Sequence, residues 1–149
     1  MKVKECMCKK VCSANPETTI YDITKIMKDE HIGCVPICDG QDSIVGLVTD
    51  RDVVLRGVAT NKDIKTTPVS EIMTTKVCCC KVDDEINTAQ RKMSEEQIRR
   101  LPVVENNKVV GILTMGDLAH YGDEIGKNQV CSTIEGICNC NNSQVRNCY

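Results

Sequence analysis

The stretch IVGLVTDRD at residues 44–52 decides the fold, because the chain nearly repeats it as VVGILTMGD at residues 109–117. Both copies carry a glycine, two apolar residues, a threonine and, three residues further on, an aspartate. The matching residues, each 65 positions apart, are Gly46 with Gly111, Thr49 with Thr114 and Asp52 with Asp117. Such a repeat predicts two similar structural units, and its polar residues predict two similar sites.

The similarity between the two halves of the chain extends upstream of this motif. Apolar and proline positions recur 66 residues apart, namely Ile20 with Ile86, Ile23 with Ala89, Met27 with Met93, Ile32 with Ile98 and Pro36 with Pro102. The repeat covers residues 1–124. We therefore predict a first domain at residues 1–65, a second domain at residues 66–124 and a flexible, cysteine-rich tail at residues 125–149.

The pattern in each half predicts a strand, a helix, two strands and a second helix, in that order. Residues 19–27 carry apolar side chains at helical spacing. Two apolar runs, at residues 34–38 and 43–49, flank an Asp39-Gly40 turn and predict an antiparallel hairpin. We expect the second helix directly after Asp52. The predicted fold class is α+β, with two βαββα units packed as a pseudo-two-fold pair.

Length and composition are consistent with two small units that share an interface. Half of a 149-residue chain would bury only about 60% of its unfolded surface and would be marginally stable alone. The sequence has no Phe and no Trp, so its core must be built from Ile, Val, Leu, Met and Cys.

Charge and hydropathy argue against two classes of partner. The formal net charge of −2 offers no basic face for a nucleic acid. No apolar run approaches the roughly 18 residues of a membrane span, and the start Met-Lys-Val-Lys-Glu does not lead into a signal peptide. We expect a cytoplasmic protein that binds neither nucleic acid nor membrane.

The spacing of threonine and aspartate in the repeated motif brings three kinds of polar group together. The threonine is expected at the exit of a strand, and the aspartate in the first turn of the next helix, where free N–H groups favour an anion. A carboxylate can accept two hydrogen bonds from a vicinal diol. A ribose that carries a phosphate would therefore satisfy the hydroxyl, the helix start and the carboxylate. The alternative is that Thr49 and Asp52 only cap the helix.

Two further segments make the resemblance to a known family specific. Together with Val35-Pro36-Ile37 and its partner Leu101-Pro102-Val103, the repeated motif resembles a tandem pair of cystathionine-β-synthase (CBS) domains, called a Bateman module. The resemblance covers residues 1–124 and implies a disc-like module that often forms a homodimer. It also implies regulation rather than catalysis. The implied ligand contains adenosine, as in AMP, ADP, ATP or S-adenosylmethionine, and no obligatory cofactor is implied.

The resemblance assigns roles to the residues that match the family's motif. Asp52 and Asp117 would hold ribose hydroxyls, and Thr49 and Thr114 would contact phosphate. Apolar residues would line the two base pockets, with Val11, Val35 and Pro36 in the first and Val77, Leu101 and Pro102 in the second.

The two copies differ in their basic residues. Arg99-Arg100 stands before the second proline motif, whereas Gly33-Cys34 stands before the first. In AMP-binding relatives a basic residue at this place contacts the phosphate, and bonds from arginine to phosphate are strong. We therefore expect one stronger nucleotide site, formed by Thr114, Asp117 and Arg100. Arg51 could act from the other side of the first site, and the arginine pair could alternatively lie solvated at a helix end.

Twelve cysteines raise a second hypothesis. Without a signal peptide we expect reduced thiols, and cysteines in strands pack as small hydrophobic residues. No C-x-x-C pair occurs, so no metal site is predicted, and the candidates for one are Cys131, Cys138 and Cys140 in the tail. The alternative function is a thiol-based redox or metal-binding regulator on the same fold, which would use Cys78-Cys79-Cys80 and the tail.

The sequence does not predict an enzyme. It supports no Ser-His-Asp or Cys-His arrangement, and it has no Gly-x-x-x-x-Gly-Lys loop for phosphoryl transfer. The predicted function is a regulatory module that binds an adenine nucleotide and acts on a partner protein, which the sequence does not name.

Overall fold

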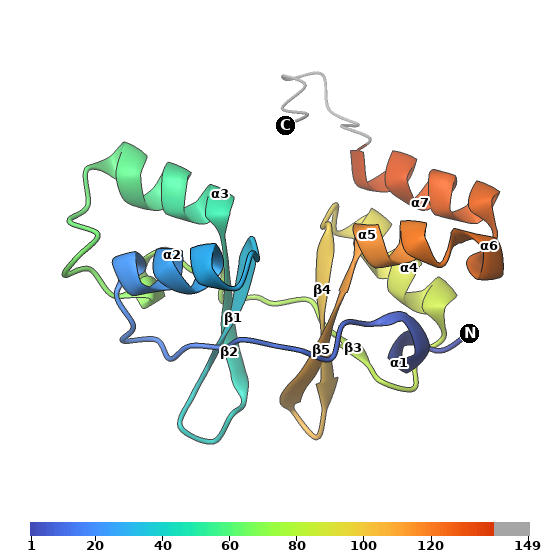
Figure 1. Ribbon diagram of the computed structural model, residues 1–149, viewed down its shortest axis with the longest axis horizontal. Coiled ribbons are helices and arrows are strands. Elements are labelled where there is room, and N and C mark those ends of the chain that lie inside the picture. The colour runs from blue at the N-terminus through green and yellow to red at the C-terminus, as the bar shows by residue number, and fades with distance from the viewer. Residues whose placement is uncertain (139–149) are drawn as a thin grey trace. The chain divides into compact units, whose positions relative to one another are not determined.

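The computed structural model describes residues 1–138, which divide into two compact units (Figure 1). The first-repeat unit comprises residues 10–77 and 105–109. The second-repeat unit comprises residues 1–9, 78–104 and 110–138 of the described chain. Both units contain helices and strands, as the predicted class α+β requires. No helix within residues 1–138 has the length and apolar character needed to cross a lipid bilayer.

The first-repeat unit is built around the predicted antiparallel hairpin. Strand β1 (Cys34–Cys38) pairs with β2 (Ile44–Thr49), and helix α2 (Ile20–Asp29) precedes them. Thr19 caps α2, because its side chain accepts a hydrogen bond from the Asp22 N–H. The remaining helical segments are α3 (Asp50–Asp52), the π-helical η1 (Val53–Gly57), and the 3-10 turns η2 (Val58–Thr60) and η3 (Val69–Glu71).

The second-repeat unit follows the same order and carries additional helices. Its sheet has the strand order β3-β4-β5. Strand β3 (Cys80–Lys81) runs parallel to the central strand β4 (Arg100–Glu105), and β5 (Lys108–Thr114) forms the other edge. Its helices are α1 (Val3–Cys6), α4 (Ile86–Glu95), α5 (Met115–His120), α6 (Gly122–Ile125) and α7 (Lys127–Cys138).

Each unit has its own core of aliphatic and sulfur-containing side chains. In the first-repeat unit the fully buried residues include Ile20, Ile23, Val35, Ile37, Val48 and Val69. In the second-repeat unit they include Val3, Ala89, Met93, Leu101, Leu113 and Leu118. The apolar stripes of α2 and α4 thus face their own cores, as their helical spacing predicts.

The segment that leads each repeat packs into the unit of the other repeat. We call residues 1–9 the first lead segment and residues 69–77 the second. Cys8 of the first exchanges two backbone hydrogen bonds with Ile112 of β5, at 2.9 and 3.0 Å. Thr74 of the second exchanges two with Leu47 of β2, both at 2.9 Å. The sequence predicts continuous domains, whereas the compact units of the structure are assembled from exchanged segments.

A methionine in each lead segment explains the glycine of the repeated motif. A Cβ atom at Gly46 would lie 2.3 Å from Met73 Sδ, and one at Gly111 would lie 2.5 Å from Met7 Sδ. At Gly111 the Cys8 carbonyl oxygen would also be only 3.0 Å away. A methionine side chain thus occupies the space beside each glycine that a Cβ atom would need.

Helix α7 corrects the prediction of a flexible tail from residue 125 onward. It packs along α4, and its residues Val130, Thr133 and Ile137 are buried. Gly136 lies against Ser94 so closely that an added Cβ atom would be 2.8 Å from Ser94 Oγ. Tertiary packing of this kind stabilises a helix whose own propensity is modest. Residues 139–149 of the predicted tail lie outside the described residues.

We expect Gly111→Ala to destabilise the protein more than Gly46→Ala. The new methyl group at position 111 meets a backbone oxygen, whereas the one at position 46 meets only a flexible thioether side chain. Overpacking of this kind costs about 1–3 kcal/mol of unfolding free energy, measurable by urea denaturation. Gly40→Ala is the matched control, because nothing lies within 4 Å of its new methyl group. Equal stability of the Gly111 and Gly40 variants would contradict the prediction.

Candidate functional site

Thr49 and Asp52 lie where β2 passes into α3. The Asp52 N–H donates to Thr49 Oγ1 at 3.2 Å. In return, the Thr49 N–H and the Thr49 hydroxyl both donate to Asp52 Oδ2, each at 2.9 Å. The two residues thus form a reciprocal capping box at the start of the helix.

Thr114 and Asp117 form the same arrangement between β5 and α5. The Thr114 N–H and hydroxyl each donate to Asp117 Oδ2 at 2.7 Å, and the Asp117 N–H donates to Thr114 Oγ1 at 3.1 Å. In both repeats the threonine ends a strand and the aspartate lies in the first helical turn. These two positions were predicted from the spacing and are confirmed.

The capping box uses one carboxylate oxygen of each aspartate. Oδ2 accepts both hydrogen bonds from the threonine, so Oδ1 is the oxygen that remains for a ligand. A carboxylate oxygen can accept from the hydroxyls of a diol. The threonine hydroxyl has one proton, which it already donates to the aspartate, so a phosphate contact with this proton would break that bond. Each threonine–aspartate pair therefore does cap its helix, and the aspartate Oδ1 remains available as a hydrogen-bond acceptor.

The two copies differ at this remaining oxygen. Arg56 Nη1 lies 3.6 Å from Asp52 Oδ1, and Asp52 is 16% exposed. Tyr121 stands at the matching position of the second repeat, and no ion pair to Asp117 is present among residues 1–138. The Asp117 charge acts on a thiol instead. Burial raises the pKa of Cys6, and the carboxylate of Asp117 raises this pKa further.

Arg56 lies beside the Asp52 carboxylate and is not among the residues predicted from the sequence. The available signal was its position four residues after Asp52 in a helical run, where opposite charges face one another. Its other partners, Ile72 and Thr74, lie in the second lead segment and could not be inferred from local spacing.

The backbone of Arg99, the first of the two predicted arginines, contacts the helix that follows Thr114. The Arg99 carbonyl accepts a hydrogen bond from the Met115 N–H at 3.0 Å, which ties the start of β4 to the start of α5. The Arg100 side chain is half-buried and that of Arg99 is exposed. Arg51, the predicted basic residue of the first site, is exposed on α3.

The apolar residues predicted to line the base pockets are more buried than the Thr-x-x-Asp motif. Val35 and Leu101 are 0% exposed and belong to the hydrophobic cores, and Pro36 and Pro102 are buried beside them. Their side chains fill the cores, so their contact with a base stays a prediction. Val11 and Val77 are half-buried, and both belong to the first-repeat unit. The role of Val77 in the second pocket likewise stays a prediction.

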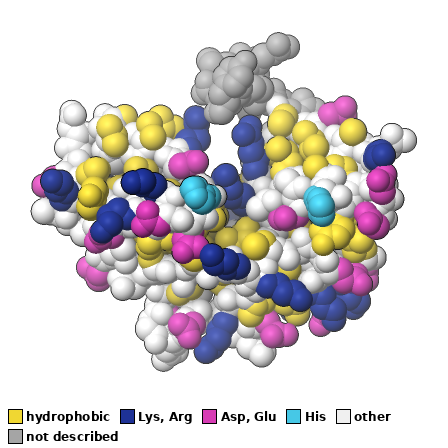
Figure 2. All heavy atoms as spheres, in the orientation of Figure 1, with side chains coloured by type: hydrophobic (Ala, Val, Ile, Leu, Met, Phe, Trp, Pro, Cys, Tyr) yellow, Lys and Arg dark blue, Asp and Glu magenta, His cyan; other side chains and the backbone are white. Residues whose placement is uncertain are grey.

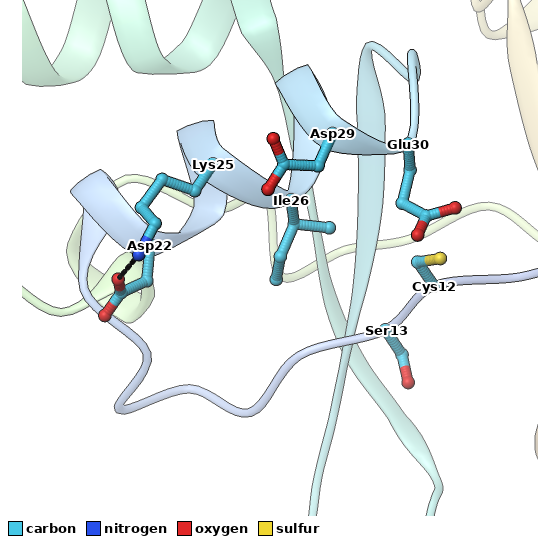
Figure 3. A pocket seen from close by; sticks show the side chains of 7 residues that line it. All are labelled: Cys12, Ser13, Asp22, Lys25, Ile26, Asp29 and Glu30. Carbon is cyan, nitrogen blue, oxygen red and sulfur yellow. Dashed lines mark ion pairs between the residues drawn. The ribbon is translucent and has the colours of Figure 1, made fainter.

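A cavity of about 490 Å³ lies elsewhere in the first-repeat unit, between α2 and residues 12–13 (Figure 3). It is lined by Cys12, Ser13, Asp22, Lys25, Ile26, Asp29 and Glu30, and by none of the predicted ligand residues. Lys25 lies 3.7 Å from Asp22, and Lys10 lies 2.6 Å from Glu30. The Lys10 ammonium lowers the pKa of the Glu30 carboxyl. Two of the three carboxylates are therefore paired within the protein.

The Cys78-Cys79-Cys80 run is packed rather than presented to solvent. Cys80 is 1% exposed, and Cys78 and Cys79 are half-buried. Burial raises the pKa of all three thiols, that of Cys80 to about 12. Because the thiolate is the reactive form of cysteine, the raised pKa values disfavour a nucleophilic role for this run near neutral pH.

The tail cysteines form no metal site within the part of the chain that the structure describes. Cys131 and Cys138 are exposed on α7, and Cys140 lies outside the described residues. No group of three or more His, Cys, Asp or Glu side chains that could hold a metal ion is found among residues 1–138.

Comparison with known proteins identifies the family. The sequence profile of the CBS domain matches residues 3–64 and 69–124, so the chain belongs to the CBS domain family and carries two tandem copies. CBS domain-containing protein YhcV of Bacillus subtilis (strain 168) is 38% identical over 117 residues, which cover 78% of this chain and 82% of that protein. Such tandem pairs are typically regulatory and ligand-binding.

Two solved structures share the fold. The CBS domain pair of protein MJ0100, in complex with 5′-methylthioadenosine and S-adenosyl-L-methionine, is similar with a TM-score of 0.76 and 30% identity, covering 83% of this chain and 98% of that one. Hypoxic Response Protein I with two coordinated zinc ions is similar with a TM-score of 0.75 and 29% identity, covering 81% and 98%.

We expect a thiol-alkylating reagent to modify Cys8 and Cys131 well before Cys80. The first two are exposed, whereas Cys80 is buried and its pKa of about 12 keeps it protonated at ordinary pH. The thiolate fraction rises with pH, so the lag of Cys80 should shrink only as the pH approaches that pKa. Mass spectrometry of the alkylated native protein measures the order. Modification of Cys80 at the rate of Cys8 in the folded protein would show that the run is accessible after all.

Proposed function

We propose that this tandem CBS pair is a cytoplasmic regulatory module that binds AMP, ADP, ATP or S-adenosylmethionine at its Thr-x-x-Asp motifs. It acts on a separate partner protein and does not catalyse a reaction itself. The observation that carries the proposal is the open Oδ1 of an aspartate whose Oδ2 is held by a capping threonine, present in both repeats. The adenosine compounds bound to the MJ0100 pair support this ligand class.

In this proposal each aspartate binds the ribose and an arginine binds the phosphate. The diol of the ribose donates to Oδ1 of Asp52 or Asp117, while the capping box keeps each carboxylate in place. In the second pocket Arg100 supplies charge-assisted hydrogen bonds to a phosphate. The Thr114–Asp117 pocket is the stronger nucleotide site, because Arg100 precedes its proline motif and the matching residue of the first repeat is the uncharged Cys34.

The alternative function as a thiol-based redox or metal-binding regulator has less support. It depends on Cys78-Cys79-Cys80, whose raised pKa values disfavour the thiolate, and on tail cysteines that form no metal group within residues 1–138. The nucleotide-binding proposal requires neither.

A homodimer is also part of the proposal, and an exposed apolar patch supports it. Val54, Leu55 and Val58 are exposed by 55%, 47% and 55%, and all three lie on the helical run after Asp52. Figure 2 shows hydrophobic side chains gathered at the surface of this run, at the upper left. Burial of such a patch against a second copy would remove apolar surface from water.

We expect Asp117→Asn to weaken AMP binding about ten-fold or more, a loss of about 1.4 kcal/mol. Asparagine retains an oxygen for the capping box but presents an amide to the ribose hydroxyls in place of an acceptor. Calorimetric titration measures the change, and Glu124→Gln removes an exposed carboxylate of the same unit as the control. Undiminished AMP binding in Asp117→Asn would refute the assignment of this pocket. Mass spectrometry of ligand retained through native purification would identify the natural ligand.

We expect Val54→Glu to convert a dimer into a monomer. A charge placed in the exposed patch would have to be buried without a partner when two copies associate. Sedimentation velocity measures the state of assembly. Ala119→Glu is the matched control, because Ala119 is exposed and holds the position 65 residues after Val54 in the second repeat. A wild-type protein that sediments as a monomer, or a Val54→Glu variant that remains a dimer, would contradict this interface.

A further inference from the structure

Arg56 makes three contacts through one nitrogen. Its Nη1 donates to the Ile72 carbonyl oxygen at 3.1 Å and to Thr74 Oγ1 at 3.3 Å, and lies 3.6 Å from Asp52 Oδ1. This nitrogen carries two hydrogens, and the two hydrogen bonds to the second lead segment use both of them. The contact with Asp52 is therefore one between charges, and it leaves Oδ1 able to accept from a hydroxyl.

We propose that Arg56 is a positioning residue that adapts the Asp52 pocket to a phosphorylated ligand and links this pocket to the second lead segment. The proposal rests on the proposed function for its ligand class, a phosphorylated adenosine compound. A carboxylate repels a phosphate bound beside it, and the repulsion is considerable where water is partly excluded. The guanidinium of Arg56 compensates the Asp52 charge, while the ribose hydroxyls use the oxygen that Arg56 does not hydrogen-bond.

The second repeat provides an internal comparison. Tyr121 replaces Arg56 there, and Cys6 occupies the position that matches Ile72. No ion pair to Asp117 is present among the described residues, and its charge is felt at the Cys6 thiol. In the proposed function the positive charge of that pocket comes from Arg100, at the start of β4. The two pockets thus receive their positive charge from different elements of the fold.

The position of Arg56 depends on the second lead segment. The arginine side chain is 53% exposed, so it is held chiefly by its bonds to Ile72 and Thr74. Thr74 is in turn held to Leu47 of β2 by two backbone hydrogen bonds of 2.9 Å. A displacement of this segment would withdraw the positive charge from Asp52. By linkage, a phosphate bound in the pocket stabilises the segment in its present place.

The test compares AMP with adenosine, which differ only in the phosphate, in an Asp117→Asn background in which the second pocket is weakened. Arg56→Gln should raise the Kd of AMP about ten-fold or more and that of adenosine less than about three-fold. Arg56→Lys should recover most of the AMP affinity, because it retains the charge. Lys25→Gln removes an exposed cation from α2 of the same unit and should leave both affinities unchanged.

Thr74→Val tests the link to the lead segment without a change of charge near the pocket. It removes one acceptor of the Arg56 guanidinium and should weaken AMP binding by a smaller factor of about three. Without any ligand, Arg56→Gln should accelerate hydrogen exchange at the Thr74 amide, which donates to Leu47.

Distinct outcomes overturn distinct parts of the proposal. Equal losses of AMP and adenosine affinity in Arg56→Gln would show a structural role only, and an unchanged AMP affinity would refute the role altogether. Unchanged exchange at the Thr74 amide would refute the link to the lead segment. If the wild type bound neither compound, the assignment of AMP as a ligand and the phosphate role would fall together, while the exchange rates would still decide the link.

Discussion

In each unit a methionine side chain from a lead segment packs against a glycine of the adjacent strand. Met73 and Met7 come from lead segments of opposite repeats, so each contact lies between a segment of one repeat and a strand of the other. A side chain at Gly111 would meet the Cys8 backbone oxygen of the first lead segment, whereas one at Gly46 would displace the side chain of Met73. The capping threonines leave the same strands three residues later, so the placement of both candidate sites depends on this one close approach.

Local features of the structure could be predicted from the sequence, and exchanged or distant ones could not. Hairpins and helices follow from turn residues and periodicity, which act over a few positions. The exchange of lead segments could not be predicted in this way. The match between Met7 and Met73 in the sequence is the same whether each methionine packs on its own repeat or on the other. Helix α7 was missed because its Asn, Ser, Thr and Gly lower helix propensity, while its contact between Gly136 and Ser94 is tertiary.

For the candidate sites, too, the local features could be predicted from the sequence and the distant ones could not. The Thr-x-x-Asp spacing identifies the capping box, and therefore the aspartates, because all its hydrogen bonds span three residues. The charge environment of each aspartate is set by residues far away in the chain, such as Ile72 and Thr74 around Arg56. A motif that repeats its glycine, threonine and aspartate can thus lie in two different electrostatic environments, and a shared cap does not imply a shared ligand affinity.

The exchange of lead segments also determines the order in which the protein can fold during synthesis. Residues 1–9 are synthesised before the rest of residues 1–138, but Cys8 among them pairs with Ile112 of β5, in the second repeat. Nearly all of the first-repeat unit lies within residues 10–77 and can assemble while the second repeat is still being made. Contacts between residues so far apart in the chain form slowly, because a long loop must close first. The first lead segment is consequently made before its binding surface and is among the last parts of residues 1–138 to reach its native position.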